Sequence, residues 1–363
     1  MRRSGKAVAW KATGEKIPLV GSSPTPTVFK KMSDFLQRYE KNPILKPIPE
    51  HRWESKMVFN PAAVLKDNKI YLVYRARGED KVKGVLVSRL GLAIFKDDGV
   101  TLEKRYEKPI YEPQEWYEVG GCEDPRITKI KDRYYLLYTA YLGQKSPPLF
   151  EEEETNIAMA STKNFFRWKR HGLLLPEVLE SEKNGVLFPE KIKGYYVCYY
   201  RIEPHIYVAY SKSLENPFWR GHRVVASPRK DWWDSWKIGA GAPPIKTPLG
   251  WLFIYHGVDY PSPPRRQVKT AWGTIDWKRK YRLGVMLIDK NNPEKILYRS
   301  EKPILEPKED YEINGMVPNV VFSCGAVIKD DKLFVYYGGA DTVTCVAWCS
   351  LSLLLKKIQQ KKL

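Results

Sequence analysis

Five segments of this chain repeat one pattern, in which a Pro-bearing turn, an apolar strand and a polar break precede an aromatic-rich strand. The aromatic strands begin 64, 61, 55 and 82 residues apart and read Tyr71–Tyr74 (YLVY), Tyr135–Tyr138 (YLLY), Tyr196–Tyr199 (YVCY), Trp251–Tyr255 (WLFIY) and Leu333–Tyr337 (LFVYY). A recurring pair of strands indicates an array of small sheets, because one such sheet cannot bury its own apolar face. Five repeats predict an all-β fold, a five-bladed β-propeller with short helical terminal segments.

The same pattern divides the chain into three parts. Residues 1–40 lack the repeat and are predicted to be an N-terminal extension with a short helix over Ser33–Tyr39, capped by Ser33. Residues 41–350 are predicted to form one propeller domain, and residues 351–363 a basic C-terminal segment that closes as a helix. The last repeat interval is lengthened by an insertion at 259–280, which we interpret either as a surface loop or as a lid or oligomer contact.

Composition narrows the class of protein. Formal charge is +19, but the basic residues are spread along the chain, and no zinc-finger, helix-turn-helix or RNA-binding motif is present. This favours a solvated basic surface over nucleic-acid binding. The five Cys form no CxxC pair, so neither a metal site nor a disulfide scaffold is indicated. No apolar run reaches the length of a membrane span or signal peptide, which predicts a cytoplasmic location and no membrane partner.

Each aromatic strand is followed by polar or glycine residues that a propeller would bring to one mouth. They are Arg75, Thr139, Arg201, His256, and Gly338 before Asp341. The densest polar segment is Gly120–Arg126 (GGCEDPR), which alone is as consistent with an ordinary salt-bridged turn as with catalysis. It lies just before an inner strand, as do Asn60-Pro61, Pro189-Glu190 and Pro318-Asn319, so Asp124 is expected to point into the channel.

A second set of side chains is cationic or can become so. Lys183, Arg201, Lys237 and His256 come from the third and fourth repeats, and Tyr281 adds a hydroxyl. Such donors repel one another around one cavity unless an anion joins them, and phosphate fits their charge and hydrogen-bonding capacity. The sequence therefore predicts one acid facing an anion pocket. No Walker A loop, GxSxG elbow, HExxH helix or Rossmann fingerprint points to another chemistry.

From about Asn42 to Asp341 the chain resembles glycoside hydrolase family 130, the mannoside phosphorylases and related β-mannosidases. The resemblance is carried by Val58–Pro61 (VFNP), Gly121–Thr128 (GCEDPRIT), Asn184–Ile192 (NGVLFPEKI), Trp232–Pro244 (WWDSWKIGAGAPP), Gly250–Val258 (GWLFIYHGV), Tyr281–Leu287 (YRLGVML) and Val317–Phe322 (VPNVVF). It implies a five-bladed propeller. It also implies inverting phosphorolysis of a β-mannoside to α-mannose 1-phosphate, without a cofactor, with inorganic phosphate as co-substrate and with a homo-oligomer as an open option.

The resemblance also implies a role for each matching residue. Asp124 matches the catalytic acid, and in some members its proton travels through the 3-hydroxyl of the sugar. Phosphate-binding positions match Lys183, Arg201, Lys237, His256 and Tyr281, while sugar-binding positions match Asn60, Arg75 and Asp341. A single acid suffices because phosphate, unlike water, needs no general base.

Two departures from the family pattern leave alternatives open. Lys183 replaces a common Arg, and Tyr200-Arg201-Ile202 replaces a His-Arg-Pro segment, so the acceptor sugar and the 1,4 or 1,2 linkage are not fixed. A β-mannosidase of the same family is the first alternative. A propeller that only binds sugar, or a basic scaffold that binds nucleic acid, is the second.

Overall fold

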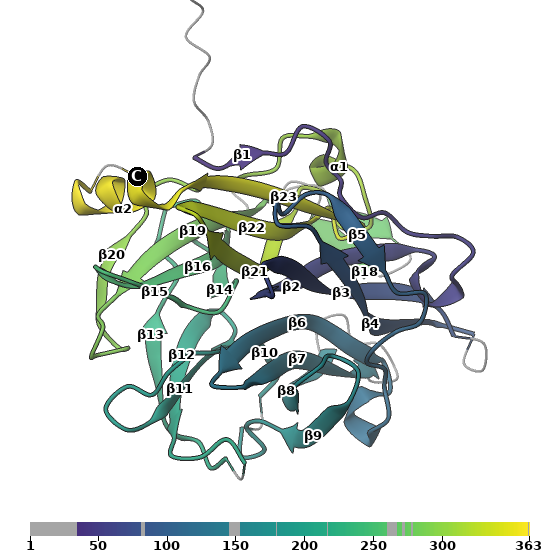
Figure 1. The fold of residues 1–363 in the computed structure, drawn as a ribbon, viewed down its shortest axis with the longest axis horizontal. Helices are drawn as coiled ribbons and strands as arrows, with labels where there is room; N and C mark the ends of the chain where they lie inside the picture. Colours follow the sequence, from purple (N-terminus) through teal and green to yellow (C-terminus); the bar gives the residue numbers. More distant parts are fainter. Residues whose placement is uncertain are drawn as a thin grey trace, which may run out of the picture. The chain divides into compact units, whose positions relative to one another are not determined.

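The computed structural model of the protein consists mostly of β-strands, with few helices (Figure 1). It describes residues 35–80, 84–144, 153–178, 180–215, 217–259, 267–270, 273–276, 279–361 and 363. Most of the predicted N-terminal extension and much of the 259–280 insertion therefore lie outside the described residues. In the described part, no helix is long and apolar enough to cross a membrane.

Within the described residues, the strands form five antiparallel units that follow one another along the chain, and we number them units 1 to 5. A single parallel bridge between Ser88 and Gly121 joins units 1 and 2 into one sheet. Unit 1 contains β2 (Met57–Lys66), β3 (Lys69–Glu79), β4 (Leu86–Phe95) and β5 (Leu102–Arg105). Unit 2 contains β6 (Gly121–Ile130), β7 (Arg133–Gln144), β8 (Glu153–Thr162) and β9 (Trp168–Leu173).

The remaining units repeat this plan. Unit 3 contains β10 (Glu182–Leu187), β11 (Tyr196–Ile202), β12 (His205–Ser211) and β13 (Arg220–Ala226). Unit 4 contains β14 (Lys237–Ala240), β15 (Ile245–Thr247), β16 (Gly250–Val258), β19 (Tyr281–Ile288) and β20 (Ile296–Arg299). Unit 5 contains β21 (Val321–Lys329), β22 (Lys332–Gly339), β23 (Val343–Ser350) and β1 (Gln37–Arg38), and a separate hairpin contains β17 (Gln267–Thr270) and β18 (Gly273–Asp276).

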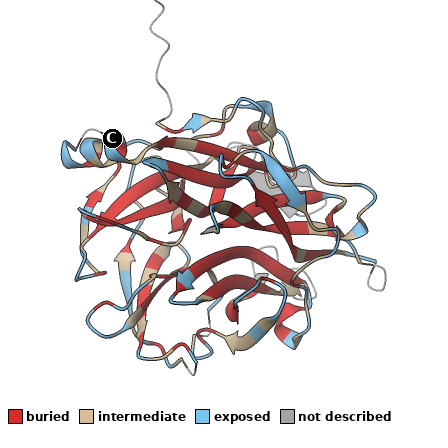
Figure 2. Ribbon diagram, viewed as in Figure 1, coloured by how far each residue is buried: buried red, intermediate tan, exposed pale blue. Residues whose placement is uncertain are grey.

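The five predicted aromatic strands are confirmed as β3, β7, β11, β16 and β22, each of which pairs with the first strand of its unit. Their residues are largely buried, as Figure 2 shows for the strand interiors. Two of the hairpins that lead into them turn on Asp67-Asn68 and Asp330-Asp331, whose positive φ angles (50°, 58°, 47° and 53°) suit tight two-residue turns. Aromatic and β-branched residues fit this position because both faces of the strand are covered.

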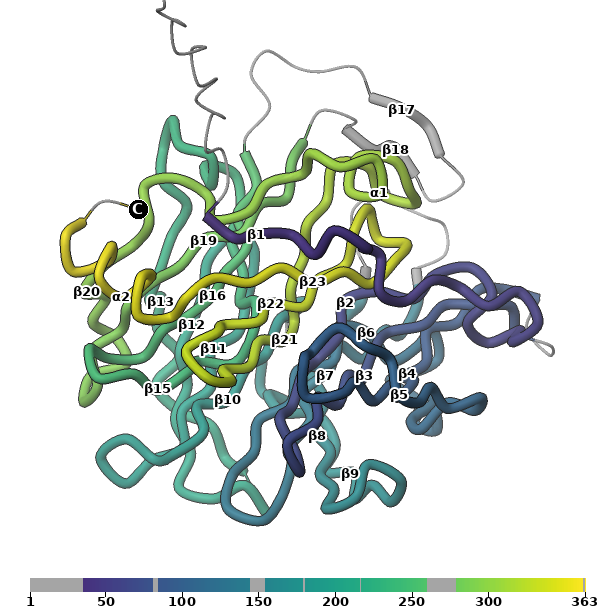
Figure 3. Tube along the Cα trace, turned by 45° about the horizontal axis from the view of Figure 1, so that its top comes forward, coloured from purple at the N-terminus to yellow at the C-terminus, as the bar shows by residue number. Residues whose placement is uncertain are grey.

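Near the two described ends of the chain, β1 and α2 both pack on β23 of unit 5. The predicted helix over 33–39 is wrong for residues 35–39, because Gln37 and Arg38 form β1, which pairs with Trp348 and Ala347 of β23 (Figure 3). Leu36 is buried against the unit 5 core, so its burial outweighs local helix propensity. The predicted C-terminal helix is confirmed as α2 (Leu351–Gln359), whose Ser350 cap accepts a hydrogen bond from the Leu353 backbone. The other short helices are α1 (Asp310–Ile313), η1 (Arg52–Glu54) and η2 (Trp116–Glu118), the last two being 3₁₀.

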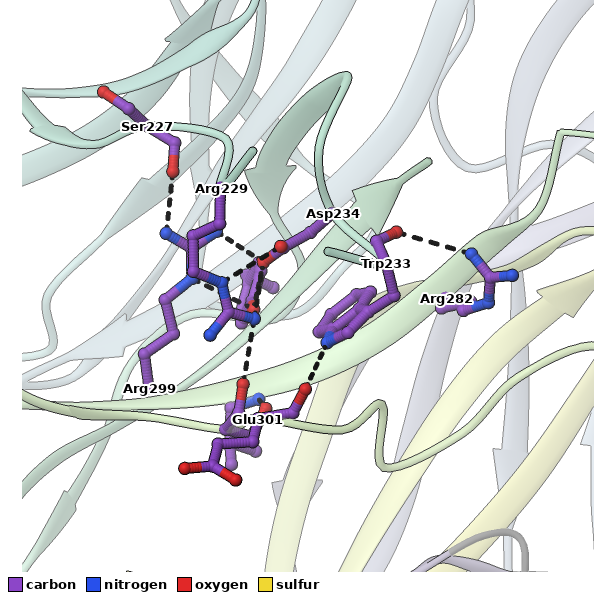
Figure 4. A network of polar contacts seen from close by, with 10 residues as sticks. Ser227, Arg229, Trp233, Asp234, Arg282, Arg299 and Glu301 are labelled. Carbon is purple, nitrogen blue, oxygen red and sulfur yellow. Dashed lines mark hydrogen bonds and ion pairs between the residues drawn. The ribbon is translucent and has the colours of Figure 1, made fainter. Parts of the chain in front are cut away.

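A repeated polar network anchors the aromatic strands. In unit 4, Asp234 is fully buried and accepts hydrogen bonds from Tyr255 Oη (2.7 Å), Arg229 (3.0 Å) and Arg299 (2.5 Å) (Figure 4). Units 1, 2 and 5 have the same trio of a tyrosine at the end of the aromatic motif, an arginine and a buried carboxylate: Tyr74–Arg105–Glu54, Tyr138–Arg170–Glu118 and Tyr337–Arg38–Glu312. In unit 3 the corresponding Tyr200 contacts His222, which pairs with Glu177. The sequence repeat thus encodes a repeated buried anchor.

Candidate active site

The first strands of the five units meet one another and between them carry four of the predicted site residues, Asn60, Asp124, Lys183 and Lys237. Strand β2 packs against β6 and β21, and β10 packs against β6 and β14. In units 1 to 3 the pairing of this strand is interrupted by one extra residue, and Asn60, Asp124 and Asn184 occupy the interruption with φ of 48°, 49° and 58°. Asn and Asp tolerate this left-handed conformation, and such bulges redirect side chains beside active sites. The position expected for Pro189-Glu190 is therefore filled by Asn184-Gly185, and Glu190 pairs instead with exposed Lys246.

Asp124 lies at the centre of a buried hydrogen-bond network. Its Oδ1 accepts from Asn60 Nδ2 at 2.9 Å and from Arg75 Nη1 at 3.1 Å. Arg75 also donates to Glu123 and, through Nε, to Ser88 Oγ at 3.1 Å, and its guanidinium stacks on Phe59. Three of the sequence-predicted residues are thus in direct contact, and the orientation of the Asp124 carboxylate is fixed by two donors.

Asp341 shares this charge environment. Burial of Asp124 opposes its ionisation, but Arg75 and Arg126 hold the pKa of Asp124 below its ordinary value. Burial raises the pKa of Asp341 to about 7, with Arg75 opposing the shift and the negative charges of Asp124 and Glu123 adding to it. Below about pH 7 Asp341 therefore keeps a proton that an isolated Asp would have lost, whereas Asp124 favours its ionised form.

Arg126 connects Asp124 to unit 4. Its buried guanidinium donates to the backbone oxygens of Asp124, Ala240 and Gly241, each at 2.9 Å. Ala240 ends β14, the strand that begins with Lys237. One side chain therefore fixes the acid-bearing turn to the strand that carries a predicted phosphate ligand. The sequence interpretation mentioned Arg126 only as part of the segment Gly120–Arg126, for which a salt-bridged turn was one of two hypotheses, and missed this role.

The predicted cations Lys183, Arg201 and Lys237 lie together, and we call these three residues the cation cluster; the carboxylate of Glu203 lies among them. Lys183 and Arg201 are cross-strand partners in β10 and β11. Glu203 Oε1 accepts from Lys237 Nζ at 2.7 Å and lies 3.1 Å from Arg201 Nη2. Burial and the neighbouring Arg201 lower the pKa of Lys237 to about 8, which is the response expected of crowded positive charge.

His256 and Tyr281 complete this side of the site. His256 is fully buried, its Nε2 lies 3.5 Å from Arg201 Nη1, and its ring packs on Phe322. Burial, followed by Arg201, Arg126 and Lys237, holds the pKa of His256 well below its ordinary value, so the expectation of a cationic or switchable His256 is wrong and the imidazole is neutral. Burial raises the pKa of Tyr281 to about 12, with Arg201, Glu203, Asp341 and Lys183 as its charged neighbours. Tyr281 is therefore a neutral hydrogen-bond donor within electrostatic range of both Asp341 and the cation cluster.

Close packing makes this convergence depend on glycine. A Cβ added to Gly239 would lie 2.5 Å from both Asn184 Oδ1 and His256 Cε1, and one added to Gly338 would lie 2.1 Å from Asn60 Oδ1. Among the described residues, several buried site atoms have no hydrogen-bond partner in the protein: Asn60 Oδ1, Asn184 Oδ1, Arg201 Nε and His256 Nδ1. Unpartnered buried polar atoms indicate a site built for a polar ligand. Within the described part of the chain, no group of His, Cys, Asp or Glu has the arrangement of a metal site.

Comparison with known proteins places this geometry in a family. The profile of the Glyco_hydro_130 family, described as beta-1,4-mannooligosaccharide phosphorylase, matches residues 35–360. Two relatives from Thermoanaerobacter sp. (strain X514) are a beta-1,2-mannobiose phosphorylase, 42% identical, and a 1,2-beta-oligomannan phosphorylase, 40% identical. Each match covers 86% of this chain and 96% of the relative.

A solved structure agrees with these matches. The beta-1,2-mannobiose phosphorylase from Listeria innocua, in complex with beta-1,2-mannobiose, superposes with a TM-score of 0.72 at 27% identity. The alignment covers 90% of this chain and 99% of that chain. This chain belongs to glycoside hydrolase family 130, the mannoside phosphorylases.

Proposed function

We propose that this protein is a β-mannoside phosphorylase in which Asp124 donates a proton and the cation cluster binds phosphate. The observation that carries the proposal is the link through Arg126, which joins the turn of Asp124 to the strand of Lys237 by hydrogen bonds of 2.9 Å. An acid and an anion site held in one rigid frame can act on opposite sides of a glycosidic bond.

The reaction needs one acid and one anion. A phosphate oxygen attacks the anomeric carbon of mannose, the bond to the glycosidic oxygen breaks, and the proton of Asp124 passes to that oxygen. Inversion at the anomeric carbon yields α-mannose 1-phosphate and the shortened sugar. Arg75 and Asn60 stabilise the Asp124 carboxylate left behind, since both already donate to its Oδ1. A phosphate dianion bound nearby also disfavours ionisation of Asp124 before the reaction, which counters its lowered pKa.

The remaining predicted residues take roles around this centre. Asn60, Arg75 and Asp341 bind the mannose ring, and Lys183, Arg201, Lys237, His256 and Tyr281 hold the phosphate. Neutral His256 acts as a hydrogen-bond donor or acceptor rather than as a charge. The five antiparallel units are the blades of a five-bladed propeller whose first strands surround the site, which is supported by their mutual packing.

We also assign a β-1,2 linkage to the substrate. The relatives at 42% and 40% identity and the superposed structure carry names that specify β-1,2-mannosides. The test is incubation of β-1,2-mannobiose and β-1,4-mannobiose with and without inorganic phosphate. We expect α-mannose 1-phosphate and mannose from the 1,2-linked sugar only when phosphate is present. Equal sugar release without phosphate would identify a β-mannosidase instead.

A further inference from the structure

A carboxylate occupies the anion-binding side of the site. Glu203 lies in the hairpin between β11 and β12, two residues after Arg201. A single oxygen of Glu203 serves both cations, since Oε1 lies 2.7 Å from Lys237 Nζ and 3.1 Å from Arg201 Nη2. A carboxylate oxygen bridging two cations has the hydrogen-bonding arrangement that a phosphate oxygen would adopt between them.

The three side chains differ in their freedom to move. Arg201 and Lys237 are 8% and 12% exposed, so their charged groups are held by surrounding protein, while the Glu203 side chain is 48% exposed. Burial opposes ionisation of Glu203, yet Arg201, Lys237 and Lys183 lower its pKa to about 2, so it is an anion at neutral pH. The carboxylate can therefore swing toward solvent while the cations stay in place.

We propose that Glu203 is a built-in competitor of phosphate that sets the phosphate affinity of this site. This inference rests on the proposed function, because it assumes that phosphate binds to Arg201 and Lys237. Phosphate must displace the Glu203 carboxylate from both cations before it can be held for attack. Anions of lower charge compete less well with an attached carboxylate, so Glu203 also makes the site selective for a dianion.

An opposite role for Glu203 predicts an opposite result. If the carboxylate served to orient Arg201 and Lys237 for phosphate, its removal would loosen both cations and weaken phosphate binding. If it competes, its removal strengthens phosphate binding. The sign of the change in phosphate affinity therefore separates the two roles without reference to its size.

The experiment compares Glu203→Gln and Glu203→Ala with the wild-type protein, using inorganic phosphate as the probe. Glu190→Gln is the matched control, because Glu190 is also 48% exposed and pairs with a lysine, Lys246, at 2.6 Å between the same two units. Phosphate dissociation constants are measured by calorimetry, and phosphate KM at saturating β-1,2-mannobiose. We expect both values to fall by about 3- to 10-fold in each Glu203 variant, as partly exposed ion pairs are weak. The mannobiose KM should not change, and Glu190→Gln should match the wild type.

Unchanged or weaker phosphate binding in both Glu203 variants would overturn the proposal. A wild-type protein that neither binds phosphate nor requires it would refute the phosphorylase assignment itself. Phosphate-dependent wild-type activity combined with unaltered variants would refute the role of Glu203 alone.

Discussion

Replacing Arg201 with Ala tests the cation cluster most selectively. Arg201 is 8% exposed, lies 3.5 Å from neutral His256, and is the cross-strand partner of Lys183. A hydrogen bond to a charged group contributes about 1.5–3 kcal/mol. At about 1.4 kcal/mol per tenfold change, loss of one such bond to phosphate raises the phosphate KM by roughly 10- to 150-fold. Because Arg201→Ala also frees Glu203 from one of its two cations, we expect a value toward the lower end of that range.

The assay is phosphorolysis of β-1,2-mannobiose over a range of phosphate concentrations, with circular dichroism as a check on folding. Arg223→Ala is the control, since this substitution removes the same charge from the same sheet, but at a side chain that is 65% exposed and pairs with Glu294. A specific rise in phosphate KM, with the mannobiose KM and the control unchanged, is the expected outcome. Phosphate kinetics identical to those of the wild type would remove Arg201 from the site and refute this reasoning.

Three further predictions concern packing, proton binding and stability. Gly239→Ala should abolish most activity while leaving the protein folded, because its Cβ would lie 2.5 Å from Asn184 Oδ1 and His256 Cε1; activity near that of the wild type would contradict the close packing. Between pH 3.8 and about 7, Asp341 binds a proton in the folded state that the unfolded chain releases, so its contribution to stability falls as the pH rises through this window. The melting temperature of Asp341→Asn, relative to that of the wild type, should therefore be higher at pH 8 than at pH 4. A difference in melting temperature that does not depend on pH would exclude the raised pKa. Asp234→Asn should lower the free energy of unfolding, measured by denaturant titration, by about 3–5 kcal/mol, because it leaves Arg229 and Arg299 without their buried carboxylate. As a control, Asp231→Asn at an exposed position should change the free energy of unfolding by less than about 0.5 kcal/mol. Equal effects of the two substitutions would show that the anchor is dispensable.

The repeat was predictable because the residues on both faces of each aromatic strand are constrained, which leaves a recurring sequence pattern. Each aromatic strand is covered on two sides, and in units 1, 2, 4 and 5 its terminal tyrosine, such as Tyr74 or Tyr255, belongs to an anchor with arginine and a buried carboxylate. The anchors themselves could not be predicted, because Arg38 and Glu312 are 274 residues apart and it is the pairing of β1 with β23 that brings them together. The helix expected over 33–39 failed for a related reason, since pairing with β23 decides the conformation of β1.

The site was predictable to a different degree on its two sides. Asp124 and Arg201 follow from motifs and from strand ends, but the neutral state of His256 depends first on its burial and then on charges from three separate strands. Glu203 had a signal that the sequence interpretation did not use: residues two apart on an extended strand share a face, so Glu203, which directly follows β11, could have been placed beside Arg201. The bridging role of Arg126 had no comparable signal, because it depends on backbone oxygens of unit 4.

The most direct test of the account is a crystal structure of the Asp124→Asn variant with β-1,2-mannobiose and phosphate bound. We predict phosphate oxygens within hydrogen-bonding distance of Arg201 and Lys237, and the side chain at position 124 on the opposite side of the anomeric carbon, near the glycosidic oxygen or the 3-hydroxyl. Phosphate bound away from the cation cluster, or a sugar whose glycosidic bond lies out of reach of position 124, would contradict the account.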